Sequence, residues 1–138
     1  MKSLPRLLAL PMLLLFLSSC ELLYTGADPV AEVVSAVVED INDPILAGYL
    51  DVGYRVTNYG TKNVPGGSRV EFTAWLYDTS IEKQVAVDFW AAAFPMGGLP
   101  PGRTMQSNVS VDYYMRVDIG NVDAARSTVS VRGVRMMP

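Results

Sequence analysis

The stretch Val70-Glu71-Phe72-Thr73-Ala74-Trp75-Leu76-Tyr77 (70–77) decides the fold, because its side chains alternate between two kinds. The even-numbered positions are all apolar, whereas the odd-numbered positions carry a carboxylate, a hydroxyl, an indole and a phenol. A period of two places one set of side chains in a core and the other set on the opposite face of a β-strand. Val85, Val87 and Phe89 repeat the pattern after a short interval. The two runs therefore predict neighbouring antiparallel strands of one sheet.

The register of these two strands follows from the requirement that both apolar sets share one face. In an antiparallel hairpin this leaves residues 79–82 as a four-residue loop. It also places Trp75, Tyr77 and Trp90 on the outer face, with Thr73 opposite Asp88 between the two tryptophans. The expected apolar pairs are Leu76 with Val85, Ala74 with Val87, and Phe72 with Phe89.

Alternation of the same kind predicts further strands at residues 50–56, 105–113 and 126–136. Gly133 interrupts the last of them, which indicates a bulge, and residues 118–125 are expected to form an irregular connection. The segment 33–40 fits a helix by the spacing of its apolar residues and a strand by its many valines, and we favour the strand. With Pro- and Gly-rich turns and no long helix, the chain is expected to be an all-β antiparallel sandwich.

The N-terminal segment has the layout of a secretion signal. A basic head at residues 2–6, an apolar core at 7–17 and two serines precede the only cysteine, Cys20. The apolar run is shorter than the roughly 20 residues that cross a bilayer, and Pro11 disfavours a buried helix. The sequence Leu17-Ser18-Ser19-Cys20 resembles the lipobox of bacterial lipoproteins. That resemblance implies cleavage before Cys20 and attachment of a lipid to its thiol.

Three short motifs resemble those of small bacterial immunoglobulin-like domains of the FxLYD type. They are a strand ending in a V-x-N-x-G turn (56–60), a strand ending in Leu-Tyr-Asp (76–78), and a Leu-x-Pro-Gly turn that enters a strand (99–102). The chain departs from the pattern by an insertion at residues 65–67 and by lacking a glycine directly after Asp78. The resemblance implies an antiparallel immunoglobulin-like β-sandwich of about six to seven strands that serves as an extracytoplasmic binding or accessory module. It carries over no catalytic or ligand-binding residue.

These features divide the chain into a signal peptide (1–19), a lipidated tether (20–31) and an immunoglobulin-like domain (32–138). Two or three acyl chains on Cys20 would hold the domain stably at a membrane of the bacterial envelope. Glu21, rather than aspartate, follows the cysteine. By analogy with enterobacterial sorting, this favours the outer membrane, with the domain facing the periplasm.

Composition argues against several classes of function. Cleavage would leave 119 of the 138 residues with nine basic and fourteen acidic side chains, a net charge of 9 − 14 = −5. This charge and the lack of a basic cluster argue against nucleic acid as a partner. The chain has no histidine, which removes His-based catalytic triads and the common zinc sites. We expect no cofactor, no metal and no catalytic residue.

The outer-face aromatics Trp75, Tyr77 and Trp90 are the main candidate site. They could stack on the sugar rings of a carbohydrate or of peptidoglycan, or anchor an envelope protein. The interpretation favoured from the sequence is that the second sheet, residues 113–114 or the tether covers them. We expect a membrane-anchored binding or scaffold module for a protein partner, with glycan recognition as the alternative.

Carboxylates supply two weaker hypotheses. The segment 40–43 has oxygens that suit calcium but lacks the full ligand loop, so we expect a solvated turn. Asp78 with Glu82, or Glu71 with Asp88, could provide the paired carboxylates of a glycan hydrolase. Such neighbours arise by chance in a small acidic domain, and hydrolysis is therefore the least favoured hypothesis.

Overall fold

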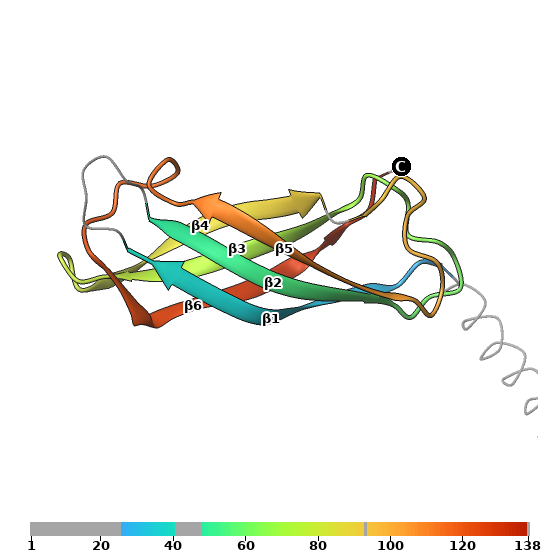
Figure 1. The fold of residues 1–138 in the computed structure, drawn as a ribbon, viewed down its shortest axis with the longest axis horizontal. Coiled ribbons are helices and arrows are strands. Elements are labelled where there is room, and N and C mark those ends of the chain that lie inside the picture. The colour runs from blue at the N-terminus through green and yellow to red at the C-terminus, as the bar shows by residue number, and fades with distance from the viewer. Residues whose placement is uncertain (1–25, 41–47, 93, 138) are drawn as a thin grey trace, which may run out of the picture.

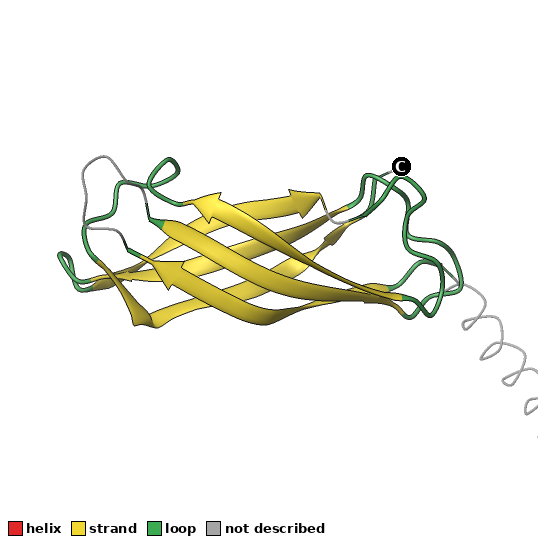
Figure 2. Ribbon diagram, in the orientation of Figure 1, coloured by secondary structure: helices red, strands yellow, loops and turns green. Residues whose placement is uncertain are grey.

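Alternating side chains along most of the chain produce six β-strands. The computed structural model describes residues 26–40, 48–92 and 94–137, and no helix occurs within these ranges (Figures 1 and 2). The strands are β1 (Pro29–Glu39), β2 (Tyr49–Asn58), β3 (Arg69–Asp78), β4 (Lys83–Ala92), β5 (Thr104–Asp112) and β6 (Val122–Arg135).

The strands form two antiparallel sheets in the orders β1-β2-β5 and β4-β3-β6. The chain changes sheet after β2, β4 and β5, and the two sheets pack face to face as a sandwich (Figure 1). In an immunoglobulin-like sandwich the first, second and fifth strands likewise share one sheet, while the third and sixth share the other. The predicted fold class is confirmed, with six strands.

The inner faces of the two sheets supply the core. The Phe72 ring of β3 stacks on that of Phe89 in β4, with 5.1 Å between centroids. It also meets the Tyr54 ring of β2 edge-on at 5.3 Å, so one side chain joins the two sheets. The predicted register of β3 and β4 is confirmed, as is the loop at residues 79–82. The fully buried side chains include Leu50, Val52, Val56, Val70, Ala74 and Leu76.

The segment for which a helix was the alternative is a strand, and it begins earlier than predicted. β1 starts at Pro29, so residues 29–31, which were expected to belong to the tether, are part of the sheet. A bulge between Val33 and Ser35 changes which residues face the core. Before the bulge the odd-numbered residues pair with the inner face of β2, and after it the even-numbered ones do. Because the bulge changes the inward-facing set from odd-numbered to even-numbered residues, the apolar residues of this strand are not spaced by two throughout. Their spacing therefore resembles that of a helix.

The last strand also begins earlier than predicted, at Val122 within the segment expected to be irregular. A register shift opposite Trp75 and Tyr77 inserts extra residues into β6, which breaks the alternation by which strands are recognised. The Ser127 side chain bridges the gap, because its Oγ accepts the N–H of Tyr77 (3.0 Å) and donates to the carbonyl of Asp123 (2.7 Å). The bulge predicted at Gly133 is confirmed by a second shift.

Two of the quoted turn motifs lie against each other at one end of the sandwich. The buried Asn58 side chain donates from Nδ2 to the carbonyl oxygens of Lys62 (2.8 Å) and Leu99 (2.9 Å). Its Oδ1 accepts the N–H groups of Gly60 (3.0 Å) and Asp28 (3.1 Å). A single amide therefore satisfies four backbone groups, which fixes the turn after β2 to the loop before β5.

Candidate binding surface

Two tryptophans lie exposed on the outer face of the β4-β3-β6 sheet. Trp75 of β3 is 43% exposed and Trp90 of β4 is 52% exposed. The expectation that neighbouring segments cover them is wrong for both. Tyr113 and Tyr114, which were expected as a cover, instead lie at one end of the sandwich with their hydroxyl groups on Asp40. Tyr77 is half-buried, and the guanidinium of Arg126 lies 3.7 Å from its ring centroid.

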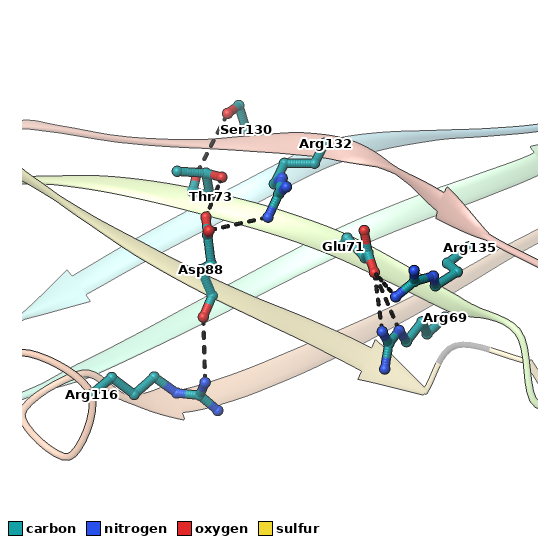
Figure 3. A network of polar contacts seen from close by, with 8 residues as sticks. All are labelled: Arg69, Glu71, Thr73, Asp88, Arg116, Ser130, Arg132 and Arg135. Carbon is teal, nitrogen blue, oxygen red and sulfur yellow. Dashed lines mark hydrogen bonds and ion pairs between the residues drawn. The ribbon is translucent and has the colours of Figure 1, made fainter.

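Arginines gather on this outer face, where carboxylates hold several of them in place (Figure 3). Glu71 lies between Arg69 (3.3 Å) and Arg135 (3.6 Å), and the Arg69 guanidinium lies 5.1 Å from the Trp90 ring centroid. Such a cation above an indole face is attracted to the ring. We call this surface, with its tryptophans Trp75 and Trp90 and its arginines, the tryptophan face.

Asp88 organises the middle of the tryptophan face. Its carboxylate accepts the Thr73 hydroxyl (2.6 Å) and pairs with Arg132 (3.1 Å), as the predicted register of Thr73 and Asp88 requires. The backbone carbonyl of Asp88 accepts a hydrogen bond from Arg116 (3.3 Å), which reaches over from the connection between β5 and β6 (Figure 3). The polar centre between the two indoles is therefore preorganised.

The two outer faces of the sandwich carry opposite charge. Five arginines and three carboxylates gather on the tryptophan face, an excess of two positive charges. They are Arg69, Arg116, Arg126, Arg132 and Arg135 with Glu71, Asp88 and Asp123. The outer face of β1-β2-β5 carries Glu32, Glu39, Asp51 and Asp112 with a single Arg55, an excess of three negative charges. A cationic face on an acidic chain favours an anionic partner.

No basic cluster was expected from the sequence, yet the structure brings Arg126, Arg132 and Arg135 together on one face. Their gathering depends on the register of β6, which two bulges shift away from a simple alternation. Arg69 and Arg116 lie outside the predicted strands, so no periodicity marked them as neighbours of Trp90. The detectable signal was compositional, since three arginines occur among the last thirteen residues of the chain, from Arg126 to Pro138.

Two hollows flank Trp90. The larger, of about 490 Å³, lies between the edges of the two sheets and is lined by residues 109–112 of β5 together with Trp90, Met115 and Arg116. The smaller, of about 100 Å³, lies on the tryptophan face beside Asp88 and Arg132. Trp90 therefore contributes to the walls of both hollows.

Three of the four carboxylates considered for hydrolysis, Glu71, Asp88 and Asp78, are engaged in other contacts. Glu71 and Asp88 are both paired with arginines. The buried Asp78 carboxylate accepts the Ser80 hydroxyl (2.6 Å) and the Gly120 N–H (2.8 Å). These hydrogen bonds, the Ser80 hydroxyl foremost, lower the pKa of Asp78. A catalytic acid needs the opposite shift, so Asp78 functions as the anchor of a turn.

Of the segment considered for calcium, residues 41–43 lie outside the described part of the chain. Asp40 is described, and its carboxylate accepts hydrogen bonds from Tyr114 (2.5 Å), Tyr113 (3.2 Å) and the N–H of Val122 (2.9 Å). Within the described ranges no group of three or more Asp, Glu or Cys side chains is arranged to hold a metal ion. Burial, followed by the hydrogen bond to Asp40, raises the pKa of Tyr114 to about 12.

The predicted lipid attachment residue Cys20 lies outside the described residues, as do the signal peptide and residues 20–25 of the tether. Among the residues that the structure describes, no helix has both the length and the apolar character needed to cross a membrane.

Comparison with known proteins gives one distant structural likeness. The chain matches no family model and no curated protein. A crystal structure of the "putative ApaA protein" from Bordetella pertussis aligns with 63% of this chain and 68% of that chain, at 18% identity and a TM-score of 0.35.

Proposed function

We propose that this protein is a lipid-anchored module of the bacterial cell envelope that binds a protein partner through the tryptophan face. The observation that carries the proposal is that Trp75 and Trp90 remain about half exposed while arginines and carboxylates hold their surroundings in place. Leaving two indoles in water forgoes burial that the core could have used. Tryptophan and arginine are also the residues most enriched among the energetically dominant contacts of protein interfaces.

Chain length supports a position close to the membrane. The described domain begins at Gly26, six residues after Cys20, and a fully extended segment of that length spans at most about 20 Å. The Gly26 carbonyl accepts the N–H of Thr61 (2.9 Å), which fixes the start of the domain to the end that holds Asn58. A lipid on Cys20 would thus hold the tryptophan face within reach of other proteins at the same membrane.

The test is crosslinking in cells of the tagged full-length protein, compared with a Cys20→Ser form that cannot be lipidated. A partner recovered near stoichiometry with the lipidated form, and lost with Trp75→Ala or Trp90→Ala, is the expected result. Tyr59→Ala, which removes an exposed aromatic ring outside the tryptophan face, serves as the control and should retain the partner. If the tryptophan variants retain the partner fully, this face is not the binding surface. If the native and Cys20→Ser forms both fractionate as soluble proteins, there is no lipid anchor.

Glycan recognition is the second candidate, and one observation favours it. An indole braced by Arg69, with the Asp88 carboxylate nearby, offers a stacking surface and a hydrogen-bond acceptor to a sugar. Titration calorimetry of the purified domain with soluble peptidoglycan fragments tests this candidate. Heat that disappears with Trp90→Ala would support it, and the absence of heat at millimolar fragment would remove it.

A further inference from the structure

The four edge strands of the sandwich are not equivalent. β1 and β6 each carry a bulge, and they lie side by side along one seam of the sandwich (Figure 1). β4 and β5 pair with their neighbours without any register shift, and the larger hollow beside Trp90 lies between them. Bulges protect edges from pairing with another chain. One seam is therefore protected and the other is open.

We propose that β5 accepts an extended, acidic segment of the partner protein as an added strand, at the edge that faces the hollow. This inference rests on the proposed function and names the contact through which the partner is held. Strand addition uses the free N–H and C=O groups of an edge for affinity and neighbouring side-chain pockets for specificity.

The hydrogen bonds at both ends of β5 fix which of its backbone groups are free. The Asn58 N–H donates to the Arg103 carbonyl (3.0 Å), and the Tyr113 N–H donates to the Gly48 carbonyl (3.2 Å). Both pairs continue the register of β2 and β5. Along an antiparallel strand, the backbone N–H and C=O groups of successive residues point alternately toward the neighbouring strand and away from it. The odd-numbered residues 105–111 therefore bond to β2. The backbone N–H and C=O groups of the even-numbered residues Gln106, Asn108 and Ser110 point away from β2. No backbone partner for these groups occurs among the described residues.

The sequence of β5 leaves this edge unprotected. The strand reads TMQSNVSVD, without proline, lysine or arginine, which are the residues that usually block edge pairing. Four consecutive residues, 109–112, line the hollow. Because side chains of successive residues point to opposite faces, a run of four indicates that the edge of the strand itself borders the hollow.

The chemistry of the far wall favours an acidic segment. Arg116 lines the hollow and donates a hydrogen bond to the Asp88 carbonyl, and no carboxylate within the described ranges forms an ion pair with it. The Asp112 carboxylate accepts the N–H of Tyr114 (3.1 Å) and so builds the turn that presents Met115 and Arg116. An extended peptide that pairs with β5 would place alternate side chains toward Trp90 and Arg116. A sugar lacks the regular alternation of donors and acceptors that this edge offers.

A selection from displayed random peptides of nine residues, the length of β5, tests the proposal on the purified domain. We expect the selected peptides to be rich in acidic and β-branched residues. Arg116→Glu should weaken their binding by about tenfold or more, as expected for a close charge pair. Lys83→Glu, an equal charge reversal at the far end of β4, is the matched control and should leave binding unchanged.

A backbone test separates strand addition from ordinary charge attraction. Ser110→Pro removes an outward N–H without removing a bond to β2, a position at which an edge strand tolerates proline. This variant should abolish peptide binding. N-methylation of every second peptide amide should also abolish binding when the methylated amides are those that point toward β5, and should leave binding intact when they are the amides that point away. The methylated peptides are measured on the native domain, so this arm does not depend on the folding of the proline variant.

Three outcomes would overturn strand addition at β5: no selected peptides, binding insensitive to both Arg116→Glu and peptide methylation, or peptides lost only with Trp75→Ala. The last outcome would leave the proposed function standing, because it places the partner on the open tryptophan face. If the partner in cells is recovered equally with the native protein and with the Trp75, Trp90 and Arg116 variants, the proposed function is wrong as well.

Discussion

The inner and outer faces of β3 belong to the same ten residues but follow different rules. On the inner face Val70, Phe72, Ala74 and Leu76 are all fully buried. On the outer face Trp75 is 43% exposed although it offers more apolar surface than any of them. A sequence chosen for stability alone would place its largest apolar side chains inside. The contrast indicates that the inner face holds the fold, and under the proposed function the outer face is kept for contact with a partner.

The largest expected effect is on the inner face. Phe72→Ala should lower the free energy of unfolding by about 3–5 kcal/mol, because it removes a ring that contacts aromatic residues of both sheets and leaves a cavity. Urea denaturation followed by fluorescence measures the change. A loss of less than about 1 kcal/mol would mean that the core repacks around the gap, and the contrast between the two faces would weaken.

The next effect lies at the end of the same inner face, at Asp78. Because its pKa is lowered in the folded state, the ionised carboxylate stabilises the fold above the pKa of the unfolded chain, about 3.9. That stabilisation is lost as the pH falls through the lower folded pKa. Asp78→Asn should therefore be less stable than the native protein at neutral pH, and the difference should shrink below about pH 4.

Denaturation measured from neutral pH down to the acid limb tests this prediction. Asp51→Asn removes the same charge from an exposed site on the other sheet and controls for the change in net charge. A stability difference between the native protein and Asp78→Asn that stays constant with pH would show that the hydrogen bonds of Asp78 do not depend on its charge.

On the outer face the expected effects on stability are small. Trp75→Ala and Trp90→Ala should each cost about 1–2 kcal/mol, less than Phe72→Ala, since each indole is about half exposed before the substitution. Thermal unfolding of both variants beside Phe72→Ala measures this directly. If either tryptophan variant unfolds as readily as Phe72→Ala, its ring belongs to the core and the tryptophan face is not a binding surface.

How much of this molecule the sequence predicts differs between strands for physical reasons. β3 and β4 alternate without interruption, so their register, their loop and the outward direction of Trp75 and Trp90 could be derived. β1 and β6 contain bulges, and each bulge shifts the side chains that follow it to the other phase. Consequently the starts of both strands were predicted too late.

The exposure of the tryptophans could not be derived in the same way. Whether an outward side chain is covered depends on loops, and the position of Tyr113 and Tyr114 follows from their contacts with Asp40, a residue more than seventy positions earlier. No local pattern encodes such a contact. The cluster of arginines was hidden for a related reason, because it gathers side chains from β3, β6 and the connection between β5 and β6.

The smallest expected effect is that of Arg132→Gln. Its ion pair with Asp88 is exposed on both sides, and such pairs contribute about 0–1 kcal/mol and weaken in high salt. The Thr73 hydroxyl remains on Asp88 in this variant, so stability should barely change. Partner binding should fall much more than stability, because Arg132 helps position the carboxylate between the two indoles. Denaturation in low and high salt, beside the binding assay, measures both. A large salt-dependent loss of stability would instead place the outer network among the interactions that hold the fold.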